Sequence, residues 1–143
     1  MQIPHDSFVL VADGRKSLFF RNQGDADFPN LAVEAKEVDV NPAHHEQASD
    51  LAGRASNTLG SSMDEVDFHQ QEEDRFAAET AAMLKARALQ GDFDALVVVA
   101  PPRTLGELRK HYHKEVERRL VAEVPKDLVN VPVAEIEKVL QAA

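Results

Sequence analysis

Three short stretches near the start of the chain have the apolar pattern of β-strands. Residues 7–12 and 17–22 are apolar runs, and the Asp-Gly pair in the intervening Asp13–Lys16 segment is a strong hairpin signal. Residues 31–39 alternate apolar with charged positions, which predicts a half-exposed strand. Because the connections are short, we expect these three strands to form an antiparallel meander.

A fourth strand is predicted over residues 94–100, which end in a continuous apolar run rich in valine. Such a run is typical of a strand that is covered on both faces, as in an α/β sheet. Pro101 and Pro102 end the strand, because proline has no N–H to donate to a neighbouring strand. Arg103 follows at the carboxyl end of the strand, where open α/β sheets place their ligands.

An apolar face with the period of an α-helix recurs in three further segments. These predicted helices span residues 68–90, 104–119 and 132–141. The second begins with the capping-box pattern Thr104–Glu107, and Gly91 suits the left-handed position that follows the first. The first helix leads directly into strand 94–100, so we expect a crossover onto a parallel neighbour. With a short fifth strand over 120–124, the pattern predicts one α/β domain over residues 1–143.

Residues 41–67 have no clear period and contain few large apolar side chains. Connections of this length without secondary structure are usually functional or disordered. We expect residues 41 to about 64 to be mobile in the absence of a partner, because too little apolar surface is available to offset the entropy of ordering them.

Composition restricts the classes of function. The 143 residues carry a net charge of −9 and include no cysteine. The charge argues against a general nucleic-acid-binding surface, and the missing cysteines exclude disulfides, thiol catalysis and cysteine-ligated zinc. The first residues do not form a basic segment followed by an apolar one, and no apolar run is long enough to span a membrane. We therefore expect a cytoplasmic protein without a membrane partner, and the sequence does not indicate its oligomeric state.

Charge is distributed unevenly between the first two predicted helices. The first is strongly acidic, which the preference of the helix dipole for acidic residues in the first turn largely explains. The second concentrates cations, which are Arg103, Arg109, Lys110, Lys114, Arg118 and Arg119. A cationic patch on an anionic protein is the footprint of a phosphate or RNA contact. The alternative is a solvated helix face with ordinary ion pairs, of which Glu115 with Arg119 is a well-placed example.

Residues that could carry catalysis or bind a metal are not suitably spaced. His44 and His45 are adjacent, and His111 and His113 are two residues apart, whereas helical zinc sites use histidines four residues apart. The chain has no nucleophile-elbow motif and no glycine-rich phosphate loop. We therefore predict no catalytic residue, no metal site and no cofactor.

Four blocks of the sequence resemble, in the same order, the bacterial host attachment protein family, also described as protein required for attachment to host cells. The blocks are residues 9–20, 69–79, 93–109 and 126–137. The most specific is Ala-Pro-Pro-Arg-Thr-Leu-Gly-Glu-Leu-Arg, which ends at Arg109. That family is in turn similar to the middle domain of archaeal and eukaryotic peptide-chain release factors. The resemblance implies a mixed five-stranded sheet flanked by helices, ribonuclease-H-like in shape.

The resemblance also implies a function for the long loop. In release factors, the loop between the third strand and the first long helix carries a Gly-Gly-Gln tip that helps water attack the peptidyl ester. The equivalent loop here, residues 41–67, contains no Gly-Gly-Gln, which argues against peptide release. Its candidate functional residues are Gly53, Arg54, Ser56 and Gly60.

The first function that these observations support is a non-catalytic binding factor for the ribosome or other structured RNA. Its phosphate contacts would be Arg103, Arg109, Lys110 and Lys114. A guanidinium beside a helix N-terminus suits a phosphate group, and pairing of Arg103 with an internal carboxylate is the open alternative.

The second function, from a different class, is a small metal-dependent hydrolase or nuclease. Such a site needs carboxylates that converge at the strand ends. Asp13 and Asp39 lie near two predicted strand ends, but strand 94–100 ends without a carboxylate. A direct role in attachment to host cells is a third alternative, and it would require secretion.

Overall fold

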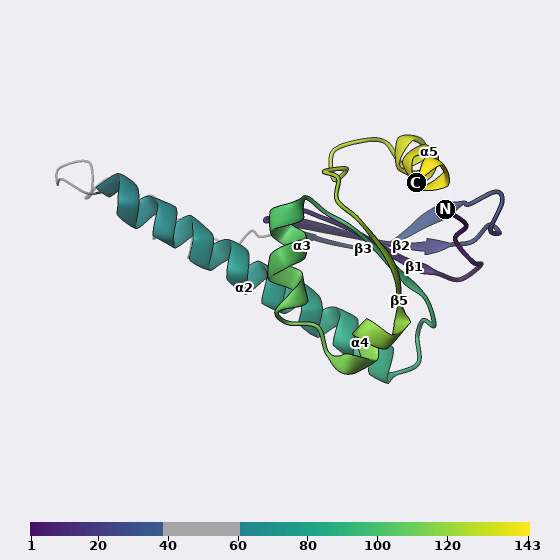
Figure 1. Cartoon of the computed structure of the whole chain (residues 1–143), viewed down its shortest axis with the longest axis horizontal. Coiled ribbons are helices and arrows are strands. Elements are labelled where there is room, and N and C mark those ends of the chain that lie inside the picture. Colours follow the sequence, from purple (N-terminus) through teal and green to yellow (C-terminus); the bar gives the residue numbers. More distant parts are fainter. Residues whose placement is uncertain (39–60) are drawn as a thin grey trace.

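A computed structural model of the chain describes residues 1–38 and 61–143. In chain order, its elements are β1 (Phe8–Ala12), β2 (Lys16–Asn22), β3 (Leu31–Val38), α2 (Ser61–Leu89), β4 (Leu96–Val99), α3 (Pro102–Arg109), α4 (Lys114–Arg119), β5 (Leu120–Val124) and α5 (Val133–Ala142). The strands form one sheet in the spatial order β3-β2-β1-β4-β5 (Figure 1).

The sheet is mixed, as the family resemblance implied. β1 pairs antiparallel with β2, and β2 pairs antiparallel with β3, so the predicted meander is confirmed. β4 lies between β1 and β5 and runs parallel to both, which confirms the predicted crossover onto a parallel neighbour. Because β1 and β4 are parallel, their carboxyl ends meet at the same edge of the sheet.

Helices pack on both faces of the sheet (Figure 1). One face packs against α2, α3 and α4 around a cluster that includes Phe8, Leu84 and Leu108. The other face packs against the N-terminal segment and α5, around Val9 and Ile136 among others. All residues of β1 and β4 are buried, as expected of strands that are covered on both faces. In the described ranges, no helix is both long and apolar enough to cross a membrane.

Two predicted turns are confirmed. The Oδ1 atom of Asp13 accepts hydrogen bonds from the backbone N–H groups of Arg15 and Lys16, at 2.8 and 2.7 Å, which closes the turn between β1 and β2. Gly91 follows α2 with a φ of +71°, a conformation that costs glycine little because it has no Cβ.

α2 begins at Ser61, earlier than the predicted start at residue 68. The prediction of a loop over 41–67 is therefore wrong for 61–67. It relied on an apolar face, which a helix needs only where it packs, and Figure 1 shows that the N-terminal half of α2 extends beyond the sheet. The predicted mobility of residues 41–60 lies outside the described residues. The same holds for the candidates Gly53, Arg54, Ser56 and Gly60.

The predicted helix 104–119 is in fact two helices, α3 and α4. His113 separates them, because its Nδ1 atom accepts a hydrogen bond from the N–H of Glu115 at 3.0 Å and so caps α4. The apolar period continues through the break, since Tyr112 and Val116 contact the same core cluster as α3. The apolar period follows burial and not helix ends, so it predicted one continuous helix where there are two.

The predicted capping box at the start of α3 is also wrong. α3 begins at Pro102, its N-cap residue is Pro101, and no side chain caps it. Proline at the first helical position presets φ and has no N–H that needs a partner. The helix therefore starts before Thr104, and Arg103 lies within its first turn.

Candidate functional site

The carboxyl ends of β1 and β4 meet beside the start of α3, and a narrow pocket lies at this edge. The pocket is lined by Asp13, Gly14, Glu73, Ala77, Arg103, Thr104 and Glu107. Asp13 directly follows β1, and Arg103 lies close behind β4. The sequence therefore placed Arg103 correctly at the carboxyl edge of the sheet, but it did not indicate that Glu73 of α2 lines the same pocket.

Arg103 is both exposed and paired with a carboxylate. Its Nη2 atom lies 3.5 Å from Oε2 of Glu73, and the arginine side chain is 66% exposed. The Glu73 side chain lies over Gly14, where an added Cβ would be 2.9 Å from Cγ and Cδ of Glu73 and would make that side chain shift. This single long ion pair leaves most of the guanidinium donors open to solvent.

The other predicted phosphate contacts lie on the same stretch of chain. Nε of Arg109 donates to both carboxylate oxygens of Glu123, at 3.2 and 3.0 Å, with the arginine side chain 56% exposed. Lys110 Nζ lies 3.1 Å from Oε1 of Glu107, with the lysine side chain 65% exposed. Lys114, at the start of α4, is exposed, and none of the described carboxylates pairs with it. The structure thus places these cations in α3, directly after it and at the start of α4, mostly beside a carboxylate.

The acidic helix and the basic segment predicted from the sequence lie side by side, because α2 packs against both α3 and α4. A hydrogen bond with Glu107 is the main cause that lowers the pKa of Asp74, and the positive charges of Lys110 and His111 act in the same direction. The predicted pair of Glu115 and Arg119 is confirmed at 2.8 Å. The basic surface is therefore partly neutralised from within, as the alternative interpretation of the charge pattern expected.

The described part of the chain has no metal site that could support hydrolysis. Among the side chains that the structure describes, those of residues 1–36 and 68–143, no three His, Asp or Glu side chains are grouped so that they could hold a metal ion. Asp13 lies at its predicted strand end, while Asp39 and the histidines His44 and His45 lie outside the described residues.

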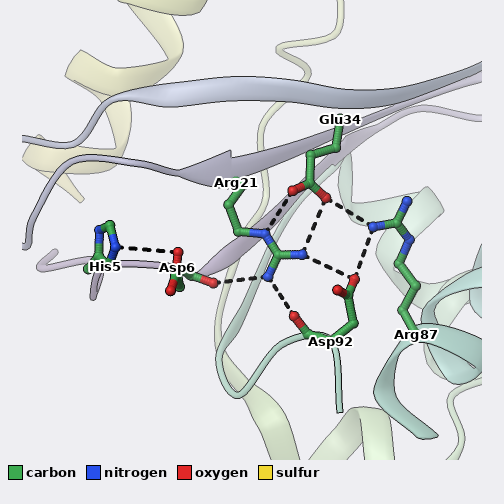
Figure 2. A network of polar contacts seen from close by, with 6 residues as sticks. All are labelled: His5, Asp6, Arg21, Glu34, Arg87 and Asp92. Atoms are coloured by element: carbon green, nitrogen blue, oxygen red, sulfur yellow. Dashed lines mark hydrogen bonds and ion pairs between the residues drawn. The ribbon is translucent and has the colours of Figure 1, made fainter. Parts of the chain in front are cut away.

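A second charged cluster lies at the opposite end of the parallel strands, and sequence analysis missed it (Figure 2). Arg21 of β2 donates through Nε to Glu34 at 2.9 Å and through Nη2 to Asp92 at 3.1 Å. Its Nη1 atom donates to the carbonyls of Asp92 and Asp6, at 2.7 and 3.2 Å. Arg87 of α2 bridges the same two carboxylates, at 2.9 and 3.0 Å.

This cluster is a brace between elements. It joins β2, β3, the end of α2 and the turn that leads into β4, and both guanidinium groups lie 5.1 Å from the ring centroid of Phe8. Hydrogen bonding to Arg21 lowers the pKa of Glu34, and hydrogen bonding to Glu34 raises that of Arg21. One signal could have revealed it: Arg87 falls on the apolar face of its helix, where a cation needs partners.

A cleft of about 680 Å³ opens beside the brace, between the segments around residues 4–7 and 91–95. Among the described residues, Arg21 is the one arginine or lysine that lines the cleft, and its side chain is only 12% exposed. The N–H donors of Arg21 already bond carboxylates and carbonyls. This cleft therefore offers an anion fewer free hydrogen-bond donors than the edge at Arg103 does.

The geometry defines an α/β protein with one exposed arginine, Arg103, among carboxylates at the carboxyl ends of its parallel strands. The sequence model that describes bacterial archaeo-eukaryotic release factor family 12 matches residues 6–140, and the chain belongs to this family. A search of curated proteins found no match. The release-factor resemblance inferred from the sequence is therefore confirmed, whereas the host attachment name stays a prediction.

Proposed function

We propose that this protein is a non-catalytic, release-factor-related factor that binds the ribosome or another structured RNA through α3 and the start of α4. The observation that carries the proposal is the exposure of Arg103, Arg109, Lys110 and Lys114 on neighbouring elements of a chain whose net charge is −9. Membership of a release-factor family supports the same class of partner.

The internal ion pairs of these side chains are compatible with phosphate binding. An ion pair between exposed side chains contributes about 0–1 kcal/mol, so exchange of a carboxylate for a phosphate costs little. A phosphate carries its charge on several acceptor oxygens and suits the planar fork of Arg103. Each neutralised phosphate also releases counterions from the nucleic acid, which adds a salt-dependent gain.

The proposal excludes peptide release as the activity. Residues 39–60, which connect β3 to α2, contain no Gly-Gly-Gln sequence. The family resemblance therefore supports a shared fold, with its ribonuclease-H-like shape, and a shared class of binding partner. It does not support a shared hydrolytic step. A role in attachment to host cells would then follow indirectly from RNA or ribosome binding.

Sedimentation with purified ribosomes tests the proposal. We expect the wild-type protein to sediment with ribosomes at low salt and to dissociate at high salt. A variant with Arg103, Arg109, Lys110 and Lys114 all changed to alanine should remain unbound at both salt concentrations.

The matched control removes four exposed lysines from other elements. These are Lys36, Lys85, Lys126 and Lys138. Both variants have the same net charge, so a difference between them reports the position of the charges. Equal loss of binding in the two variants, or a wild-type protein that never sediments with ribosomes or structured RNA, would contradict the proposal.

A further inference from the structure

The connection between β2 and β3, residues 23–30, presents an exposed aromatic side chain. Phe28 is 77% exposed, more than any other large apolar side chain of the described ranges. A single exposed apolar residue is common on protein surfaces and by itself indicates little. The loop around Phe28, however, is held by far more contacts than a passive connection needs.

Asn22, at the end of β2, organises this loop from below. The residue is fully buried, and its Nδ2 atom donates to two carbonyls of the N-terminal segment and to that of Asp25, at 2.9 to 3.3 Å. Its Oδ1 atom accepts from the N–H groups of Gly24 and Asn30, at 3.0 and 2.9 Å. One buried side chain thus fixes both ends of the loop.

The backbone of Phe28 is itself fixed. Its N–H donates to Oδ1 of Asp25 at 2.7 Å, and its carbonyl accepts from the N–H of Asp25 at 3.2 Å. A Cβ at Gly24 would lie 2.1 Å from the carbonyl oxygen of Phe28, so only glycine permits this approach. His5 and Gln141 bond the loop to the N-terminal segment and to α5, at 2.7 and 3.2 Å. Because this backbone is already ordered, a partner that binds the ring would lose little affinity to ordering it.

The charge beside the ring indicates the kind of partner. Asp25 and Asp27 are both exposed, and no lysine or arginine of residues 1–38 and 61–143 forms an ion pair with either carboxylate. Two carboxylates repel phosphate groups, so this surface does not suit a nucleic acid. They favour lysine and arginine side chains, and an exposed ring is the type of anchor that fills an apolar pocket of a protein.

We propose that Phe28, Asp25 and Asp27 form a docking site for a protein partner that has an apolar pocket rimmed by lysine or arginine. Antiparallel pairing of β1 and β2 puts this loop at the opposite end of the sheet from Arg103, and Figure 1 shows it near α5. The site is therefore independent of the proposed RNA surface, and the two proposals can fail separately.

Photocrosslinking followed by reconstitution tests this proposal. The full chain carries p-benzoylphenylalanine in place of Phe28, or, as the matched control, in place of Leu89, which is 59% exposed on α2. In cells that make the protein, we expect one discrete protein adduct at position 28 that is absent at position 89. The adduct is identified by mass spectrometry, and the purified partner is then titrated with the wild-type protein.

With the purified partner, Phe28→Ala should weaken binding by about tenfold or more, while Phe28→Tyr should retain most of it. Asp27→Asn keeps the acceptor that Gln2 uses, but it should weaken binding a few-fold and reduce the dependence on salt. The melting temperature should stay unchanged in all three. The proposal is wrong if position 28 gives no discrete adduct, crosslinks to RNA or to a second copy of this chain, or gives the adduct seen at position 89. It is equally wrong if Phe28→Ala binds the partner as well as the wild-type protein.

Discussion

Arg21 and Arg103 each lie among carboxylates, at opposite ends of the parallel strands, yet their surroundings differ. The Arg21 side chain is 12% exposed, and its Nε, Nη1 and Nη2 atoms all donate hydrogen bonds. Arg103 is 66% exposed and makes one ion pair of 3.5 Å. A guanidinium whose donors are used holds the fold together, and one whose donors are open can bind a ligand. Open donors, and not charge alone, therefore distinguish Arg103 as the candidate contact for an anion.

The largest effect expected from this comparison is on stability. Arg21→Ala should lower the free energy of unfolding by about 3 kcal/mol, because it leaves the carboxylates of Glu34 and Asp92 with fewer partners in a partly buried site. The melting temperature should fall by roughly 10 °C. Arg103→Ala, measured by the same thermal and urea unfolding, should change stability by less than about 0.5 kcal/mol. Similar losses of stability in the two variants would show that Arg21 and Arg103 do not differ in their contribution to the fold.

The pH dependence of stability sharpens the same contrast. Hydrogen bonding to Arg21 lowers the pKa of Glu34 from its ordinary value of 4.5. The ionised carboxylate therefore stabilises the fold above that value, and this contribution is lost as the pH falls through the lowered pKa. Glu34→Gln should melt at a lower temperature than the wild type near pH 7, and the gap should narrow as the pH falls below about 5 and through the lowered pKa. A gap that stays constant with pH would mean that the charge of Glu34 does not stabilise the fold.

A smaller effect is expected at the Arg103 end. Glu73→Gln removes the charge that competes with a phosphate for Arg103, so it should raise the affinity for ribosomes or structured RNA by roughly two- to fivefold. The control is Glu79→Gln, which removes a charge from the same helix where it pairs with Arg75 instead. If both variants bind equally well, the gain reflects net charge and not the contact with Arg103.

Sequence patterns predicted the parts of this fold that bury apolar side chains. The strands were predicted correctly because a buried strand needs apolar side chains, which appear in the sequence as runs such as Leu96–Val99, where every residue is buried. The start of α2 was missed because its N-terminal half extends beyond the sheet, where no apolar face is required.

The candidate site was predictable only in part, for a related reason. The position of Arg103 follows from strand order and the carboxyl-end rule. The ion pair between Arg103 and Glu73 joins residues that are far apart in the sequence, and so does the hydrogen bond between Arg21 and Asp92. No local pattern records such contacts, so they become visible only once the elements are packed together.

The most direct test of the account is the salt dependence of ribosome or RNA binding by Arg103→Ala, measured together with its melting temperature. If Arg103 contacts a phosphate, the affinity at low salt should fall and the slope of log affinity against log salt should become shallower by about 0.7–0.9. The melting temperature should stay close to that of the wild type. An unchanged salt slope together with a lowered melting temperature would contradict the account, because Arg103 would then stabilise the fold as Arg21 does.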